Sequence, residues 1–308
     1  MTPSDSLRAF LDRSRTRIDE ALDLFLPRPP DCPEIVCEAM RYSVFAGGKR
    51  LRPCLTLAAA GAIDKDSVDL ALPAACAIEL IHTYSLIHDD LPAMDDDQLR
   101  RGRPTLHVVY GEGIAILAGD GLHAEAFTLL ASAPAIHDPD TVVRKLRVLQ
   151  VVGDAAGAAG MVGGQALDLQ AAGQAPGHAT VLDAAALRDM HARKTGALIR
   201  AAAVSGAIMA GGDDAAIDAV DRYAADLGLA FQIVDDILDV EGSAAELGKT
   251  AGKDASADKP TYPSLFGLER SRSLAAESAA RAQQTLVNAQ LTSGWLGAIA
   301  DWVISRKN

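Results

Sequence analysis

The stretch FQIVDDILD, residues 231–239, sets three aspartates among apolar neighbours. In a helix, Asp239 lies one turn after both Asp235 and Asp236, so the three carboxylates share one face. Most isolated acidic triplets of this kind lie on a solvated helix surface. Here the neighbouring residues are apolar, which indicates that the aspartates are at least partly buried. Carboxylates buried together must be protonated, paired or bound to a cation. The stretch therefore predicts a partly buried helix whose carboxylates need a partner.

Helical spacing continues outward from this stretch. Near the N-terminus, apolar residues recur three and four positions apart from Leu7 to Phe25, and prolines then end the helix. Alternating runs typical of strands are nearly absent, and no low-complexity linker divides the chain. We therefore expect a single domain over residues 1–308, an all-α fold in the form of a large helical bundle. Further helices are expected over residues 34–45, 66–88, 114–132, 141–171, 183–210 and 213–240.

The composition narrows the classes to which the protein can belong. Of its 308 residues, 49% are hydrophobic, and much of this share is Ala and Leu, which are strong helix formers. The net charge of −12 argues against nucleic-acid binding, which needs a basic surface. No continuous apolar run resembles a signal peptide, and the most apolar window, residues 195–212, is interrupted by Arg200. We expect a cytoplasmic protein without stable membrane insertion.

The four cysteines give little sign of a metal centre or of a disulfide framework. Cys32, Cys37, Cys54 and Cys76 show no C-x-x-C spacing and have no histidine partners at zinc-finger intervals. In a reducing compartment such residues remain thiols. We therefore expect four buried free thiols and no disulfide.

A second acidic cluster lies far upstream, in LIHDDLPAMDDDQLRRGRPT, residues 86–105. It begins with D-D-x-x-x-x-D at Asp89, Asp90 and Asp95, and Asp96 and Asp97 adjoin it. Two such clusters, each within an apolar helix, favour a bound cation over a solvated surface. Hard oxygen ligands favour Mg²⁺, which shares its coordination with waters and substrate phosphates. An EF-hand is excluded because the D-x-D-x-D-G spacing and the closing glutamate are missing.

Basic residues gather near glycines at several places in this acidic chain. Any one group could be ordinary surface charge, but together they are typical of phosphate sites. A P-loop is excluded because G-x-x-x-x-G-K-[ST] does not occur. We predict that the carboxylates hold Mg²⁺, that Mg²⁺ holds a diphosphate, and that the basic groups neutralise it or bind a second one. These basic residues are Lys49, Arg50, Arg52, Arg100, Arg101, Arg103, Arg193, Lys194, Lys249, Lys253 and Lys259.

Taken together, the motifs resemble those of the trans-isoprenyl diphosphate synthases, or polyprenyl synthetases, over nearly the whole chain. The matching stretches occur in the family's order: GGKRLRP, HTYSLIHDDLPAMDDDQLRRGRPTLH, GMVGGQALDL, KTG, FQIVDDILD and GKTAGKDASADKPTYP. The resemblance implies an all-α bundle around a deep central cavity, usually in a homodimer. It implies a prenyltransferase that joins isopentenyl diphosphate to an allylic diphosphate and releases diphosphate. It further implies Mg²⁺ as cofactor, with three ions when substrate is bound, and Mn²⁺ as a possible substitute.

The resemblance also implies roles for individual residues. The metal ligands would be Asp89, Asp95 and Asp235. Asp90, Asp236 and Asp239 would contact these ligands or bind the metal occasionally. The pocket for isopentenyl diphosphate would comprise Gly48, Lys49, Arg52, His82 and Arg101, although by spacing alone His82 could be a hydrogen-bonded helix residue. The allylic diphosphate would meet Arg100, Lys194, Lys249 and Lys259. The allylic cation would face the carbonyl of Lys194 together with Thr195 and Gln232.

Product length depends on the depth of the cavity. Tyr84 and Ser85 lie one turn before Asp89, where the growing hydrocarbon would arrive, and a large side chain there would narrow the cavity. Tyr84 could equally be simple core. An aromatic at this position, with Pro92 and Ala93 inserted in the first motif, resembles bacterial farnesyl diphosphate synthases. We expect a C15 product from dimethylallyl or geranyl diphosphate, with a C20 product, geranylgeranyl diphosphate, as the alternative.

Three other functions fit parts of the sequence. A terpene cyclase or squalene-synthase-like enzyme also uses aspartate-rich motifs, but it lacks GGKRLRP and needs no second diphosphate pocket. A non-catalytic regulatory subunit of a synthase loses aspartates that this chain retains. An acidic ion-buffering protein does not explain the basic groups. The C-terminal SRKN resembles the basic tail that helps to cover the site in relatives, although it could be a frayed end.

Overall fold

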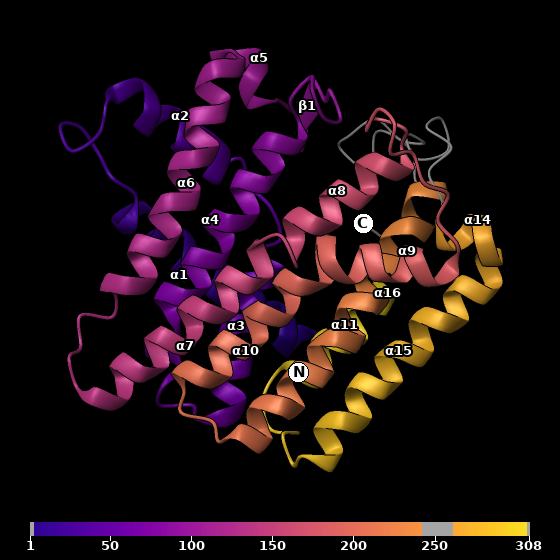
Figure 1. Ribbon diagram of the computed structural model, residues 1–308. Helices are drawn as coiled ribbons and strands as arrows, with labels where there is room; N and C mark the ends of the chain where they lie inside the picture. Colours follow the sequence, from indigo (N-terminus) through magenta and orange to yellow (C-terminus); the bar gives the residue numbers. More distant parts are fainter. Residues whose placement is uncertain (1–2, 242–260, 307–308) are drawn as a thin grey trace.

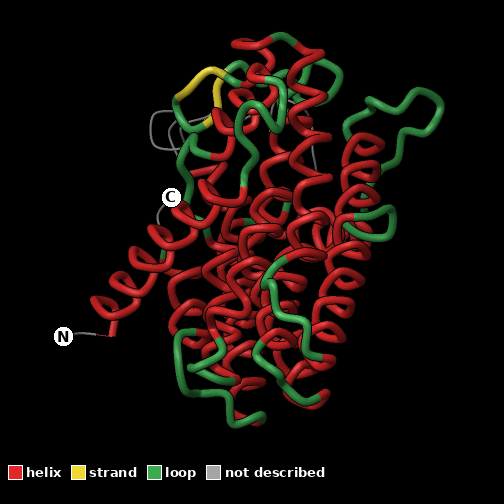
Figure 2. Tube along the Cα trace, turned by 90° about the vertical axis from the view of Figure 1, so that its left-hand side faces the viewer, coloured by secondary structure: helices red, strands yellow, loops and turns green. Residues whose placement is uncertain are grey.

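Long helices dominate the structure, a computed structural model that describes residues 3–241 and 261–306. They pack together in one bundle, and most loops lie at its two ends (Figures 1 and 2). The longer helices are α1 (Pro3–Phe25), α2 (Glu34–Val44), α3 (Leu51–Ile63), α4 (Leu72–Asp89), α6 (Glu112–Ser132), α7 (Pro139–Ala156), α8 (Met161–Ala171), α9 (Ala184–His191), α10 (Ala197–Met209), α11 (Asp214–Glu241), α15 (Leu268–Asn288) and α16 (Leu296–Ser305). Short helical segments between them are η1 (Val68–Ala71), α5 (Leu106–Tyr110), η2 (Ala192–Gly196) and α14 (Tyr262–Phe266).

The all-α prediction is confirmed, since the strands among the described residues form a single small hairpin. β1 (Leu99–Arg100) pairs antiparallel with β2 (Arg103–Pro104). Between them, Arg101 and Gly102 have φ values of 54° and 74°. Two consecutive residues at positive φ form the turn that matches the twist of a tight hairpin, and Gly102 adopts it without steric cost. The hairpin holds several of the predicted phosphate-binding arginines beside the end of α4.

The core is packed from small and apolar side chains of α3, α4 and α10. Every residue of α10 from Ala201 to Met209 is buried, so this part of the helix has no polar face. An added Cβ at Gly206 would lie 2.1 Å from the carbonyl oxygen of Thr56, so glycine allows α10 and α3 to approach closely. Both helices also pack against α4, and this close packing fixes the helix that ends at the first aspartate cluster.

Two of the expected helices are interrupted. The prediction of one helix over residues 141–171 is wrong, because the segment divides into α7 and α8. Gly157 has extended backbone angles, and a Cβ at Gly160 would lie 2.2 Å from the carbonyl oxygen of Ala155. The segment over residues 183–210 is helical almost throughout, but η2 within it is a π-helical turn. Such turns are frequent at functional sites.

The sequence patterns do not indicate α3, α15 or α16. The helices α3 and α16 are apolar on most sides, so neither has the amphipathic stripe that marks a surface helix. α15 buries mainly small residues such as Ser271, Ala275 and Ser278, whose weak hydrophobicity hides its buried face. In the structure, α15 packs along α11 and completes that side of the bundle (Figure 1).

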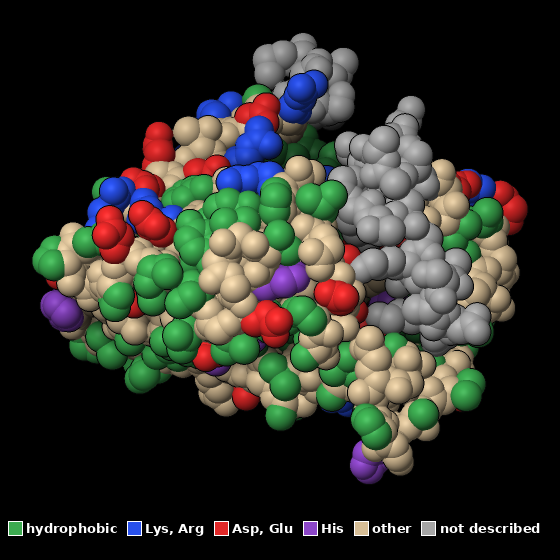
Figure 3. All heavy atoms as spheres, turned by 90° about the horizontal axis from the view of Figure 1, so that it is seen from above, with side chains coloured by type: hydrophobic (Ala, Val, Ile, Leu, Met, Phe, Trp, Pro, Cys, Tyr) green, Lys and Arg blue, Asp and Glu red, His purple; other side chains and the backbone are tan. Residues whose placement is uncertain are grey.

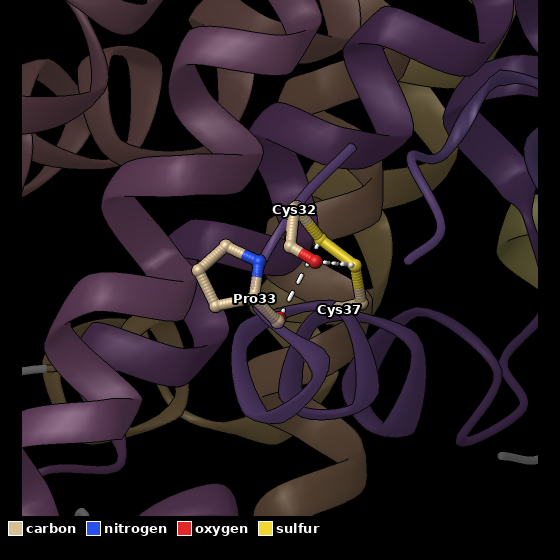
Figure 4. Close-up of a disulfide and its surroundings, with 3 residues drawn as sticks. All are labelled: Cys32, Pro33 and Cys37. Atoms are coloured by element: carbon tan, nitrogen blue, oxygen red, sulfur yellow. Dashed lines mark hydrogen bonds between the residues drawn. A yellow bond between two sulfur atoms is a disulfide. The ribbon is translucent and has the colours of Figure 1, made fainter. Parts of the chain in front are cut away.

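The expectation of four free thiols is wrong for one pair. Cys32 and Cys37 form a disulfide at the start of α2, with their Cα atoms 6.2 Å apart (Figure 4). The chain enters α2 just after Pro33, and the first turn of this helix brings Cys37 back to the preceding loop. A separation of five positions thereby becomes a distance that a disulfide can span. Cys54 and Cys76 are buried free thiols, as expected.

Two helical segments, Val68–Asp89 and Glu112–Ser132, have the length and apolar composition of a membrane span. Most of the first is buried inside the bundle, as is usual for a core helix. The second leaves part of its apolar surface open, including Ile116 and Leu117. The lack of stable membrane insertion remains a prediction, and the open face of α6 needs an explanation of its own.

Candidate active site

A largely apolar cavity of about 380 Å³ lies between the C-terminal half of α4, the helix α8 and the π turn η2. Apolar side chains of α8, namely Met161, Val162 and Leu169, line one wall, and Asp89 and Lys194 also line the cavity. Figure 3 views the molecule from above, onto the end near the hairpin, where basic, acidic and histidine side chains occur close together. The cavity therefore combines space for a hydrocarbon with charged groups on its border.

The first aspartate cluster lies where α4 ends. The chain then doubles back, and the backbone N–H of Asp95 donates to the carbonyl oxygen of Asp89 over 2.9 Å. Asp96 adopts a positive φ of 49°, which aspartate tolerates better than most residues. Burial raises the pKa of Asp89 to about 6, Lys194 opposes this increase, and Asp95 adds to it. A cation bound here would relieve the cost of keeping Asp89 ionised.

The π turn η2 contributes Lys194 and Thr195 to the same cavity. α8 approaches the turn closely because Gly164 has no side chain: a Cβ there would lie 2.2 Å from the backbone nitrogen of Lys194. The Lys194 ammonium donates to Asp168 over 2.6 Å. Burial opposes its charge, but Asp168 and Asp89 outweigh burial and raise the pKa of Lys194. Lys194 is therefore held as a cation near the first aspartate cluster.

A second pocket, of about 580 Å³, adjoins the cavity and is rich in basic side chains. A φ of 128° at Gly48 lets the backbone run against the Arg101 guanidinium, which a Cβ at Gly48 would approach to 2.6 Å. Burial, followed by the charge of Arg52, lowers the pKa of His82, so its imidazole is neutral. The pocket thus brings together every residue that the resemblance assigns to isopentenyl diphosphate: Gly48, Lys49, Arg52, His82 and Arg101.

The second aspartate motif lies near the C-terminal end of α11. Asp236 is buried and accepts hydrogen bonds from the Gln232 amide at 2.9 Å and from the backbone N–H of Tyr262 at 3.0 Å. Asp235, whose side chain is 42% exposed, pairs with Arg306 at 2.6 Å. The two adjacent carboxylates therefore differ, since Asp236 ties α11 to α14 whereas Asp235 remains accessible.

Several predicted site residues lie away from the cavity. Arg100 does not line it, because its guanidinium pairs with Asp90 at 2.5 Å and approaches Asp97 to 3.6 Å. Gln232 does not line it either, because its amide donates to Asp236. In this structure Arg100 contacts an aspartate of the first motif and Gln232 contacts an aspartate of the second. Lys249 and Lys259 lie outside the described residues.

Tyr84 and Ser85 both line the cavity. The ring of Tyr84 packs against the ring of His123, with centroids 4.8 Å apart, and meets His88 edge-on at 5.6 Å. His123 in turn meets Phe127 at 5.3 Å. Tyr84 therefore separates the cavity from a row of aromatic side chains on α6, and its position is fixed by them.

Two polar residues of α8 lie at the site, and neither was assigned a role from the sequence. Asp168 pairs with Lys194, and Gln165 lines the cavity with both polar atoms of its amide buried and, among the described residues, without a hydrogen-bond partner. A signal is present in GMVGGQALDL, where Gln165 and Asp168 lie three positions apart in an otherwise apolar helix. Polar groups on one face of such a helix indicate a polar partner.

The described residues contain no compact group of three side chains ready to hold a metal ion. Their donor set nevertheless fits Mg²⁺, because Asp89 and Asp95 are neighbouring carboxylates and burial favours a cation beside Asp89. Mg²⁺ commonly takes one or two carboxylates and completes its coordination with water and substrate phosphate. A metal site whose coordination is completed by the phosphates of a bound substrate does not need three protein ligands close together.

Comparison with known sequences identifies the family. Residues 33–290 match the family model described as polyprenyl synthetase. The chain is 47% identical over 294 residues to the farnesyl diphosphate synthase of Escherichia coli (strain K12), with 94% of this chain and 95% of that protein covered. It is 43% identical over 301 residues to the farnesyl diphosphate synthase of Geobacillus stearothermophilus, with 98% of each covered.

Solved structures match along the whole fold. A geranyltransferase from Helicobacter pylori, complexed with magnesium and isoprenyl diphosphate, has a TM-score of 0.82 at 31% identity, covering 99% of this chain and 97% of that chain. An FPP/GFPP synthase from Zymomonas mobilis, in an apo structure, has a TM-score of 0.81 at 36% identity, covering 97% and 99%. With the family model spanning most of its length, this chain belongs to the polyprenyl synthetase family and has the family's all-α isoprenoid synthase fold.

Proposed function

We propose that this protein condenses isopentenyl diphosphate with dimethylallyl or geranyl diphosphate, head to tail, to form farnesyl diphosphate. One observation carries the proposal: Arg52 and His82 line both the basic pocket and the apolar cavity. A diphosphate in the basic pocket would therefore have its hydrocarbon end beside the border of the cavity. Relatives of matching length that are named farnesyl diphosphate synthase support this choice of substrates.

The allylic diphosphate would bind at the border of the cavity, near Asp89, Asp95 and Lys194. We propose Mg²⁺ as the cofactor, three ions with substrate bound, held by Asp89, Asp95 and Asp235, with Mn²⁺ able to substitute. The magnesium in the Helicobacter pylori complex supports this choice. Bound Mg²⁺ would stabilise the negative charge that grows on the departing diphosphate. Lys194, held as a cation by Asp168, adds a second positive group.

Cleavage of the allylic C–O bond leaves a carbocation, which needs oxygen dipoles nearby and no water. Thr195 and Gln165 supply such dipoles, and the side chains of Met161 and Leu169 exclude water. The double bond of isopentenyl diphosphate attacks the cation and forms the new C–C bond. The proton lost from the adjacent carbon passes to an oxygen of the released diphosphate, the anion that cleavage of the C–O bond leaves beside the cation.

We propose a C15 product because the aromatic ring of Tyr84 borders the cavity and is fixed from behind by His123. Geranylgeranyl diphosphate remains the alternative product. The large subunit 1 of the heterodimeric geranylgeranyl pyrophosphate synthase of Arabidopsis thaliana is 46% identical over 295 residues, with 94% of this chain and 77% of that protein covered. Overall identity therefore does not separate the two chain lengths.

We further propose that the protein works as a homodimer. The helices α6 and α7 expose large apolar side chains, among them Ile116, Leu117, Val143 and Leu146, which are 43–60% exposed. Large apolar side chains exposed along neighbouring helices are typical of an interface with another protein. A second copy packed on this face would also explain the open apolar surface of α6.

Product analysis tests the proposed function. The purified chain is incubated with labelled isopentenyl diphosphate, Mg²⁺ and either dimethylallyl or geranyl diphosphate, and the prenyl products are sized after removal of phosphate. We expect farnesol from both starters and no product with excess chelator. Hydrocarbon formed from farnesyl diphosphate without isopentenyl diphosphate would instead identify a terpene cyclase, and no turnover in any mixture would overturn the proposal.

A further inference from the structure

The helix α16 is anchored to α11, and this determines where the chain continues. The Tyr223 hydroxyl on α11 donates to the carbonyl oxygen of Leu296 over 2.7 Å, and Ile299 and Val303 are fully buried. α16 ends at Ser305. The residue that follows, Arg306, is thereby placed against the part of α11 that carries the second aspartate motif.

Arg306 is held there by several contacts. Its guanidinium donates to Asp235 Oδ1 at 2.6 Å and to the carbonyl oxygen of Phe231, one turn earlier, at 2.9 Å. It also lies over the Phe231 ring, 4.0 Å from the centroid. The side chain is only 3% exposed, and its Nε is buried and has no hydrogen-bond partner within the described part of the chain. This is a specific ion pair and not a frayed end.

The partner of Arg306 is the aspartate to which the proposed function assigns Mg²⁺. A guanidinium and a magnesium ion repel each other when both lie beside one carboxylate. Asp235 therefore binds each of these cations more tightly when the other is absent. We propose that Arg306 is a built-in counter-cation: it occupies Asp235 in the free protein, competes with divalent metal for it, and is released when metal binds.

The released side chain would remain near the second pocket. Lys49 lies close enough for the charge of Arg306 to lower its pKa, second only to burial. The Lys49 ammonium is also 6.0 Å from the ring centroid of Trp302, one turn before Arg306. Arg306 therefore already lies beside the pocket assigned to isopentenyl diphosphate, and its release from Asp235 would leave its charge without a carboxylate partner there.

The inference rests on the proposed function for the identity of the metal site, so its test uses metal alone. Mn²⁺ is titrated into the full chain without substrates, and free Mn²⁺ is followed by electron paramagnetic resonance. Arg306→Gln removes the competitor. Arg270→Gln is the matched control, because it removes one positive charge from an exposed pair with Glu277 on α15. Asp235→Asn, alone and combined with Arg306→Gln, shows which part of the Mn²⁺ binding belongs to the Asp235 site.

We expect Arg306→Gln to bind Mn²⁺ at least about fivefold more tightly than the unaltered chain. Arg270→Gln should stay unchanged, and Asp235→Asn should abolish the gain. Equal affinity in the two arginine variants, or a gain that survives Asp235→Asn, would overturn the counter-cation. Circular dichroism establishes that each variant is folded. Prenyl transfer by the unaltered chain is measured separately, so loss of the proposed function and loss of the counter-cation are distinguishable.

Discussion

Replacing Tyr84 with alanine should lengthen the product from C15 to C20. The ring borders the cavity of about 380 Å³, and removing it adds the vacated space to that cavity. One more isoprene unit has five carbon atoms, and at roughly 0.8 kcal/mol for each buried methylene its full burial gains up to ~4 kcal/mol. Half of that burial, ~2 kcal/mol, favours the longer chain by about thirtyfold.

The assay sizes the products made from geranyl diphosphate and labelled isopentenyl diphosphate. Tyr110→Ala is the matched control, because Tyr110 on α5 also packs against an aromatic ring, that of Tyr42 at 5.8 Å, but does not line the cavity. Tyr84→Ala should give mainly C20 and Tyr110→Ala mainly C15. Both truncations should lower the melting temperature by several degrees, since loss of a buried aromatic costs about 3–5 kcal/mol and both tyrosines are partly buried. A folded Tyr84→Ala variant that still stops at C15 would refute the reasoning.

Three further outcomes are expected. Arg52→Gln should raise KM for isopentenyl diphosphate by about ten- to a hundredfold, since a hydrogen bond to a charged group contributes about 1.5–3 kcal/mol; steady-state kinetics that show an equal rise for the allylic substrate would contradict the pocket assignment. Asp168→Asn should lower kcat by about tenfold or more with little change in KM, because Lys194 loses the carboxylate that holds it; unchanged kcat would count against that role. Cys54 and Cys76 should resist a thiol reagent at about pH 8 until the protein unfolds, because burial raises the pKa of Cys54 to about 12 and also raises that of Cys76; rapid labelling of the native protein would contradict their burial.

Sequence patterns predict the class of fold of this protein and the family to which it belongs. The period of three and four residues indicated long helices, and the structure contains them. Asp89 and Asp235 stand out in the sequence because carboxylates inside apolar helices need a partner; their role as metal ligands stays a prediction. The boundaries were harder to predict. α7 and α8 read as one periodic stretch, and only the steric demand at Gly160, visible in three dimensions, shows why they separate.

Pairings between distant residues could not be predicted from local pattern. Asp168 and Lys194 are 26 positions apart, and Asp235 and Arg306 are 71 apart, so each ion pair depends on how whole helices pack. The Cys32–Cys37 disulfide has a different cause, because the expectation of free thiols came from compartment and spacing rules and not from the geometry of the turn into α2.

The central claim is that carboxylates at the border of an apolar cavity drive departure of an allylic diphosphate. The most direct measurement is the turnover of labelled isopentenyl diphosphate in saturating Mg²⁺ by Asp89→Asn, compared with Asp120→Asn. Asp120 lies on α6, is largely exposed and does not line the cavity. Asp89→Asn should lose about two to three orders of magnitude in kcat, whereas Asp120→Asn should stay near the unaltered rate. Near-normal turnover by Asp89→Asn would contradict the account.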